Sequence, residues 1–207
     1  MAKCKICKKE FEKRSPQHVV CCYSPCGVLY MSEITEKKRK KAWNKEKKEL
    51  KEKIKTHSDY KKELQLLVNK IARLIDYGQP CIATGKLEGK RNGGHFISVG
   101  ANDTIRFNLH NIHIQSEYSN NYKGGDNFKY CEGIERIYGI DYLERIKNLK
   151  NTKPIKLSID QLKYAIKLSK EIIKEIDKDY IISNPKDRIW QREKYNNVLG
   201  IYDSLYK

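Results

Sequence analysis

Residues 91–113 read RNGGHFISVGANDTIRFNLHNIH, and this stretch decides the fold that the sequence predicts. Polar residues alternate with β-branched and aromatic ones in HFISV and TIRFNL, which predicts two short strands joined by a wide loop. The stretch also holds three of the five histidines of the chain, His95, His110 and His113. Because helices are predicted on either side, we expect an α+β protein built around this hairpin.

Helical periodicity accounts for most of the remaining chain. Apolar residues recur at i, i+3, i+4 and i+7, the pattern of an amphipathic helix. The predicted helices cover residues 59–77, 133–150, 158–177 and part of the tail 180–207. Ser158 and Gln161 have the spacing of a capping box, and Gly139 is expected to break the helix that surrounds it.

The charge of the chain predicts a polyanionic partner. Its 207 residues contain 43 Lys+Arg and 26 Asp+Glu, a net charge of +17. Nucleic acid is the commonest such partner, while a membrane surface is disfavoured because no segment joins a strongly apolar face to the basic one. No apolar run approaches the length of about 20 residues that spans a bilayer. The start MAKCKICKKEF has no apolar signal core, so we expect a cytoplasmic protein without membrane contact.

About half of the excess charge lies in residues 37–62, which hold 13 Lys/Arg against 4 Asp/Glu, a net +9. This segment has few apolar residues, which is typical of a solvated, partly helical linker. An exposed basic helix can also lie along phosphates and release their counterions. The DNA contacts predicted in this arm are Lys37, Lys38, Arg39, Lys40 and Lys41.

Five of the seven cysteines lie in the stretch CKICKKEFEKRSPQHVVCCYSPC near the amino terminus. Cys4 and Cys7 form one close pair and Cys22 and Cys26 another, a spacing that suits a tetrahedral zinc site. Cys21 is an alternative to Cys22, and a disulfide is disfavoured in a reducing cytoplasm. We therefore predict a structural zinc ion, which would supply much of the folding free energy of so short a module.

The central stretch also carries residues suited to phosphodiester cleavage. This reaction needs a base to deprotonate water, a cation on the phosphate and groups that hold both. A neutral imidazole suits the base, because its ordinary pKa lies near the working pH. His95 is followed by Asn111 after 16 residues and by Asn120 after 9 more. These residues, on a strand, a second strand and a helix, would meet the three needs.

This spacing resembles that of the HNH, or ββα-metal, nucleases. The resemblance implies that His95 is the general base, that Asn111 braces the loop and that Asn120 helps to hold Mg²⁺ or Mn²⁺. It also places Lys123 where the family often has a basic residue, which could contact a phosphate.

Other residues of the stretch are assigned by their pattern. His110 and His113 alternate with apolar residues, so one is expected to face inward and one outward. We predict that His113 is a further ligand of the catalytic cation and that His110 lies at the surface. Arg106 is a further predicted DNA contact.

A wider order of motifs resembles the NinG family of phage recombination proteins, to which the lambda Rap protein belongs. The cysteine module, the Lys-rich arm, PCIATG, GGHF and RFNLHNIH follow one another within residues 3–177. The resemblance implies a structure-specific endonuclease that cleaves branched DNA, such as Holliday junctions or D-loops, in the cytoplasm of a host bacterium. Symmetric cutting of a junction would favour a homodimer, although the sequence shows no interface.

The chain departs from these patterns around the predicted cation. Many family members have paired cysteines where this chain has Cys81, Thr84, Ser116 and Ser119. We therefore predict no second zinc site. Gly94 replaces an acidic or histidine ligand found in many HNH enzymes, with Asn92 as a neutral substitute. Asn120 is also a weaker ligand than histidine.

The sequence thus predicts a zinc-knuckle module, a basic helical arm, a small ββα core with flanking helices, and a carboxy-terminal helical region. These regions cover residues 1–30, 31–58, 59–150 and 151–207, in that order. The alternative function is a non-catalytic, zinc-containing nucleic-acid-binding protein, in which the ββα segment is only structural.

Overall fold

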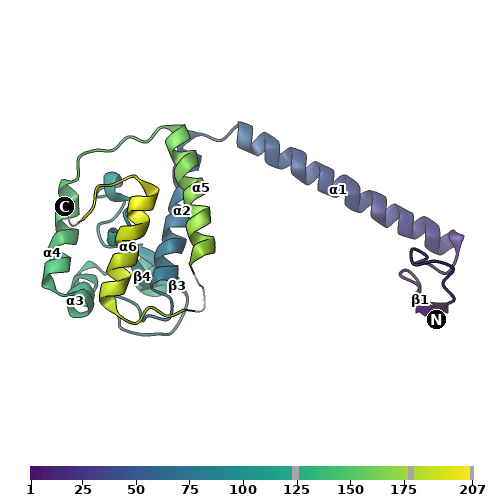
Figure 1. Ribbon diagram of the computed structural model, residues 1–207, viewed down its shortest axis with the longest axis horizontal. Coiled ribbons are helices and arrows are strands. Elements are labelled where there is room, and N and C mark those ends of the chain that lie inside the picture. Colours follow the sequence, from purple (N-terminus) through teal and green to yellow (C-terminus); the bar gives the residue numbers. More distant parts are fainter. Residues whose placement is uncertain (123–125, 177–179, 206–207) are drawn as a thin grey trace. The chain divides into compact units, whose positions relative to one another are not determined.

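The computed structural model describes residues 1–122, 126–176 and 180–205. Helices dominate, with two small two-stranded antiparallel sheets (Figure 1), so the α+β prediction is confirmed. The chain divides into two compact units, Met1–Lys55 and Thr56–Lys207. Among the described helices, none combines the length and the apolar character needed to cross a bilayer.

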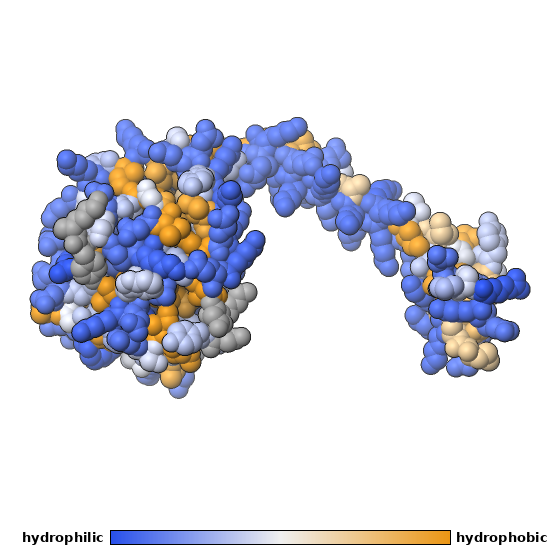
Figure 2. Space-filling model, in the orientation of Figure 1, coloured by the Kyte–Doolittle hydropathy of each residue, from blue (hydrophilic) through white to orange (hydrophobic). Residues whose placement is uncertain are grey.

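The first unit is a small cysteine-rich module followed by a long helix. Strand β1 (Ala2–Lys3) pairs with β2 (Glu10–Phe11), and the turn Tyr23–Gly27 leads into α1 (Val28–Lys53). None of the 26 residues of α1 is buried. Hydrophilic side chains cover most of its surface in Figure 2, with scattered apolar ones between them. Residues 31–53 of the predicted basic arm therefore lie in one continuous helix without buried residues, while residues 57 and 58 already belong to the next helix.

The second unit is built on α2 (His57–Ile75), which packs against α5 (Ile159–Glu175) and α6 (Pro185–Leu199). Capping boxes begin both α2 and α5. In each, the side-chain oxygen of the N-cap residue accepts from the backbone N–H of the third helical residue, whose side chain accepts from the backbone N–H of the N-cap residue. The apolar faces of α2, α5 and α6 meet in one buried cluster. Both long helices end within two residues of their predicted bounds, so these predictions are confirmed.

A hairpin lies against α2, but apart from His95 its strands lie outside HFISV and TIRFNL, so the predicted strand positions are wrong. Those residues form a loop with two 3₁₀ turns, which the side chains of Asn102 and Asn108 cap. Strand β3 (Arg91–His95) pairs antiparallel with β4 (Ile112–Ser116), with Gly94 opposite His113 and a loop over residues 96–111. Gly93 allows close packing on one face, since a Cβ atom there would lie 3.0 Å from a backbone oxygen of α2.

Two shorter helices contribute the other contacts of the hairpin. Helix α3 (Asn127–Tyr138) and helix α4 (Ile140–Asn148) meet at Gly139, whose φ of +89° suits glycine. The predicted helix break at Gly139 is therefore confirmed. Tyr130 of α3 donates a hydrogen bond to the carbonyl oxygen of Gly94, across 2.9 Å, which ties α3 to β3.

Candidate functional site

His95 ends strand β3 with its imidazole turned toward α2. Its Nε2 atom lies 2.9 Å from the carbonyl oxygen of Arg106 and 3.3 Å from Nε2 of Gln65. A carbonyl oxygen can only accept and the Gln65 nitrogen can only donate, so the two contacts require opposite tautomers. The contact with Arg106 is the shorter, so we assign the proton to Nε2 and the lone pair to Nδ1. Nδ1 has no hydrogen-bond partner in the described ranges, and it is not enclosed. The ring is therefore oriented with an unprotonated nitrogen directed away from its anchor.

Burial lowers the pKa of His95 below its ordinary value of 6.5. The hydrogen bond to the Arg106 carbonyl acts in the opposite direction, and the charge of Arg106 lowers the pKa further. The ring is thus neutral at pH 7, which is the form that can accept a proton.

Asn111 braces the loop that follows His95. Its Oδ1 atom accepts from the N–H of Ile97 at 2.8 Å, and its Nδ2 donates to the carbonyl oxygen of Ile97 at 2.9 Å. The backbone oxygen of Asn111 also accepts from the N–H of Phe96 at 2.9 Å. These bonds hold the two residues after His95 to the end of the loop. The contacts suit the bracing role that the sequence predicts for Asn111.

Asn120 lies in the turn Tyr118–Tyr122, against the backbone of Gly94. A Cβ atom on Gly94 would lie 3.1 Å from Oδ1 of Asn120 and 2.0 Å from Oε1 of the buried Gln115. A larger residue at Gly94 would therefore have to displace Gln115. Side chains of successive strand residues point to opposite faces, so Asn120 and the His95 ring address opposite faces of β3. They are close along the strand without facing each other.

His113 is fully enclosed, with only 1 % of its surface exposed. The Tyr130 hydroxyl donates to Gly94 and accepts from the backbone N–H of His113 at 3.1 Å. Nδ1 of His113 lies 3.2 Å from this hydroxyl, whose proton is already used, so Nδ1 acts as the donor. The rings of Tyr130, Tyr138 and Tyr142 surround it. A cation could reach His113 only if these tyrosines moved, so the observed position suits a structural role.

The prediction that His110 lies at the surface is wrong, because only 1 % of it is exposed. Its ring nitrogens lie 2.9 Å from the hydroxyl of Tyr142 and 2.9 Å from Oε2 of Glu193. The alternation argument fails because Leu109–Asn111 form a turn of 3₁₀ helix, and the strand starts only at Ile112.

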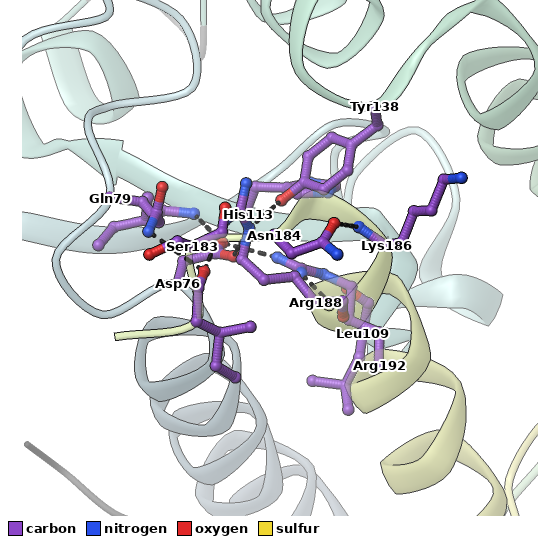
Figure 3. A network of polar contacts seen from close by, with 12 residues as sticks. Asp76, Gln79, Leu109, His113, Tyr138, Ser183, Asn184, Lys186, Arg188 and Arg192 are labelled. Carbon is purple, nitrogen blue, oxygen red and sulfur yellow. Dashed lines mark hydrogen bonds and ion pairs between the residues drawn. The ribbon is translucent and has the colours of Figure 1, made fainter. Parts of the chain in front are cut away.

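A buried polar network beside the hairpin was not predicted (Figure 3). Arg192 of α6 donates to Asp76 at 2.6 Å and to the carbonyl oxygens of Leu109 and Ile112 at 3.2 and 3.4 Å. Arg188 donates to the carbonyl oxygens of residues 182 and 183 and to a tyrosine hydroxyl. No periodic signal marks these arginines, because charged residues on a helix ordinarily lie at the surface.

The predicted DNA-contact residues occupy different environments. Lys37, Lys38, Arg39, Lys40 and Lys41 are all exposed on α1. Arg106 is partly buried, and its Nε lies 3.1 Å from Oδ1 of Asp103. Lys123 lies outside the described residues.

Four cysteine sulfurs in the first unit form a cluster that could hold a metal ion. The sulfurs of Cys4, Cys7, Cys21 and Cys26 all lie within 4.8 Å of one another. The distances of 3.5 Å from Cys7 to Cys21 and 3.7 Å from Cys21 to Cys26 approach the edge of a tetrahedron with Zn–S bonds of about 2.3 Å. The cluster is thus compatible with structural zinc.

The cluster contains Cys21 where the prediction had Cys22. The sulfur of Cys22 lies 3.8 Å from that of Cys21, but it is not part of the group of four. The N–H of Cys21 donates to the sulfur of Cys4 at 3.4 Å. Burial raises the pKa of Cys4, but backbone N–H groups including that of Cys21 outweigh it and lower the pKa to about 6. This stabilises the thiolate that binds a metal.

Only one thiol, the buried thiol of Cys81, is present at the four positions considered for a second zinc site, Cys81, Thr84, Ser116 and Ser119. The N–H of Ser116 donates to the sulfur of Cys81 at 3.2 Å, and the N–H of Ser119 donates to the hydroxyl of Ser116 at 3.2 Å. Burial raises the pKa of Cys81, but hydrogen bonds from Thr84 and Ser116 outweigh it and lower the pKa. Hydroxyl and amide hydrogen bonds thus connect the two segments here.

Comparisons with known proteins agree over most of the chain. Residues 1–179 match the family model described as Bacteriophage Lambda NinG protein. Protein ninG of Escherichia phage 933W is 31% identical over 165 residues, covering 72% of this chain and 81% of that protein. Protein ninG of Escherichia phage lambda is 35% identical over 100 residues, covering 47% of this chain and 48% of that protein. No solved structure matches the chain. The chain therefore belongs to the NinG family of bacteriophage proteins.

Proposed function

We propose that this protein is a DNA-binding endonuclease that hydrolyses phosphodiester bonds in branched recombination intermediates, such as Holliday junctions and D-loops. The observation that carries the proposal is the 2.9 Å contact between Nε2 of His95 and the Arg106 carbonyl oxygen. With the proton assigned to Nε2, this contact leaves Nδ1 able to take a proton from water. Branch specificity rests on the resemblance to phage recombination proteins.

In the proposed reaction, Nδ1 of His95 accepts a proton from the water that attacks the phosphorus atom. The lowered pKa keeps the ring neutral and ready to accept this proton. Asn111 holds the loop backbone at Ile97, and this loop leads to the Arg106 carbonyl that orients the ring. These residues therefore orient the base before the substrate arrives, which is the usual source of catalytic positioning.

A divalent cation, Mg²⁺ or Mn²⁺, would supply Lewis-acid stabilisation of the phosphate when bound. The sequence predicts Asn120 as its protein ligand, but Asn120 addresses the face of β3 opposite to the His95 ring. Phosphate oxygens of the DNA are therefore the ligands proposed for the cation beside His95. Gly94 contributes no ligand, and Gln115 fills the space beside it. Because the proposed ligands come from the DNA, we expect cation binding that depends on DNA.

Helix α1 is proposed to supply most of the DNA affinity. Its basic residues are exposed along a helix that buries none of its side chains. Because none of its side chains is needed for packing, such a helix can lie along a phosphate backbone. Release of counterions from the phosphates would then favour binding.

The cleavage assay tests His95 directly. The full-length protein should nick a four-way junction in the presence of Mg²⁺ or Mn²⁺, and His95→Ala should stop cleavage while gel-shift affinity is kept. Added imidazole should partly restore cleavage by His95→Ala, because a small base can occupy the vacated position. Cleavage that is unchanged in His95→Ala would overturn the assignment of the base.

The second candidate is a non-catalytic nucleic-acid-binding protein. The observation that favours it is the Gly94 site, where packing of Gln115 leaves no room for an acidic ligand. Metal-independent binding of branched DNA, with no cleavage by the wild type under any divalent cation, would select this function.

A further inference from the structure

A cavity of about 260 Å³ opens in the second unit at the amino-terminal end of α2. Its walls come from α2, from the loop between β3 and β4, from the segment before α5 and from the residues after α6. The residues after α6 lie beyond the part that matches the family model, residues 1–179. The cavity is therefore not a feature that the family match assigns.

The walls of the cavity are mainly apolar and aromatic. Phe107, Leu157, Leu162 and Ile201 line it together with the ring of Tyr202. Pockets that hold drug-sized ligands begin at about 300 Å³, so this slightly smaller cavity suits a single planar ring system. Flat apolar rings gain most from burial against such walls.

The rim of the cavity is basic. Lys61 and Lys156 both line it, and His57 lies beside them with its Nε2 2.8 Å from the carbonyl oxygen of Leu157. The charge of Lys61 is balanced by Asp103, which also lines the cavity. Lys156, exposed beside an apolar lining, suits a ligand that joins a neutral ring to an anion.

The cavity and His95 share one loop. Asp103 at the rim pairs with Arg106, whose carbonyl oxygen holds the His95 ring. The Tyr202 hydroxyl fixes the same loop, because it donates to the carbonyl oxygen of Thr104 at 2.7 Å and accepts from the N–H of Phe107 at 3.2 Å. A ligand seated here would lie against the loop that orients the base.

We propose that this cavity binds the base of one unpaired DNA nucleotide, with its phosphate beside Lys61 and Lys156. The inference rests on the proposed function for the identity of the polymer. Unpaired bases cost least to extrude and stack well on aromatic side chains. The site would thus favour DNA with unpaired nucleotides, as occur at branches, over uninterrupted duplex.

A titration of the full chain with dAMP, followed by amide NMR, tests the cavity without requiring DNA binding or cleavage. Chemical shifts should change at Thr104 and Phe107, and Lys156→Ala should weaken binding by about fivefold, the effect of losing about 1 kcal/mol of ion pairing. Lys167→Ala removes the same charge from an exposed position on α5 and should bind as the wild type does. Equal affinities of these two variants would overturn the proposal.

A second variant fills the cavity. Thr104→Trp should abolish the dAMP-induced shifts and should remove the preference for duplex with one unpaired 2-aminopurine over uninterrupted duplex. If this variant does not fold, the comparison of Lys156→Ala with Lys167→Ala still decides. Saturable dAMP binding by a wild type that binds no DNA would leave the cavity assigned and would overturn only the proposed function. Absence of dAMP-induced shifts at Thr104 and Phe107 would overturn the cavity assignment.

Discussion

Arg192 and Asp76 form a buried ion pair across 2.6 Å that joins α6 to the end of α2. The same guanidinium donates to the carbonyl oxygens of Leu109 and Ile112, and Asp76 also accepts from the N–H of Ile114. One pair of side chains therefore connects two helices with the hairpin. The coulombic attraction of Asp76 opposes the burial of Arg192, and the pKa of Arg192 is raised as a result.

Removing one member of this pair should be costly. Asp76→Asn leaves the buried Arg192 and Arg188 without their carboxylate, so it should lower the free energy of unfolding by about 3–5 kcal/mol. Arg192→Met should cost less, because Asp76 keeps Arg188 at 3.9 Å. Urea denaturation followed by circular dichroism measures the loss. Lys194→Met, on the same helix as Arg192, provides a control. Lys194 pairs with Glu175 of α5 at the surface, and this ion pair should contribute less than about 1 kcal/mol. The double variant should lose less than the sum of the two single variants, and strict additivity would contradict a direct interaction.

The hydrogen bonds of Asn111 predict that a substitution at this residue lowers the rate of cleavage without changing the affinity for DNA. Asn111→Asp keeps an acceptor for the N–H of Ile97 but places a carboxylate against its carbonyl oxygen. We expect a loss of about 1–3 kcal/mol in stability and a fall of about 100-fold in cleavage through misplacement of the loop. Gel-shift affinity should remain that of the wild type. Cleavage at the wild-type rate by a variant that has lost this stability would contradict the bracing role.

Local patterns predicted the elements that depend on local interactions. Helices α2 and α5 carry their own caps and apolar stripes, so their bounds follow from sequence neighbours. Alternation predicts a hairpin in this region, but it places the strands over residues 95–99 and 104–109, where the chain mostly forms a loop. The helix break at Gly139 follows from the conformational freedom of glycine. The bracing role of Asn111 is implied only by a family resemblance, and its contacts with Ile97 in the same loop are compatible with that role.

Long-range partners set the features that sequence patterns missed. Arg192 is buried because Asp76 lies 116 residues away, a relationship that no periodicity encodes. Gln65 lies against His95 only because α2 packs across the hairpin. Cys21 and Cys22 are neighbours of identical chemistry with sulfurs 3.8 Å apart, so residue type and spacing could not decide which one joins the group of four.

The buried histidines predict that stability falls in mild acid. Burial, then the charge of Arg192, lowers the pKa of His113 well below 6.5, and burial lowers that of His110 despite its bond to Glu193. The folded state therefore keeps both rings neutral where the unfolded state takes up protons. Stability should be fully present above pH 6.5 and should decrease below it, by up to about 1.4 kcal/mol per pH unit for each histidine.

Urea unfolding between pH 7.5 and 5 measures this dependence. His113→Phe should be less stable at every pH but should show a shallower slope, because one titrating group is removed. Glu193 gives the same sign, but its pKa is lowered from 4.5 to about 2 by the hydrogen bond of His110, so its contribution is lost only below this range. A slope that is unchanged in His113→Phe would contradict the neutral, buried ring.

The charge of α1 predicts a strong salt dependence of DNA binding. Replacing Lys37, Lys38 and Lys40 by Gln should lower affinity for duplex DNA about tenfold or more and should reduce the slope of log K against log salt by about 3. The matched control replaces three exposed lysines of α5, Lys163, Lys167 and Lys174, by Gln. Fluorescence anisotropy at several salt concentrations measures both. Equal effects of the two triple variants would show that net charge, and not α1, determines binding.

The cysteine cluster makes a prediction that distinguishes two adjacent residues. Metal analysis should find one zinc ion per chain, and Cys21→Ser should lose it because four thiolates complete the tetrahedron. Cys22→Ser should retain the ion, since its sulfur lies outside the group of four and only its backbone position is needed. The same pattern should appear in protease digestion of residues 1–27, because metal binding supplies folding free energy to so short a module. Loss of zinc from Cys22→Ser with retention in Cys21→Ser would restore the ligand set that sequence spacing predicts.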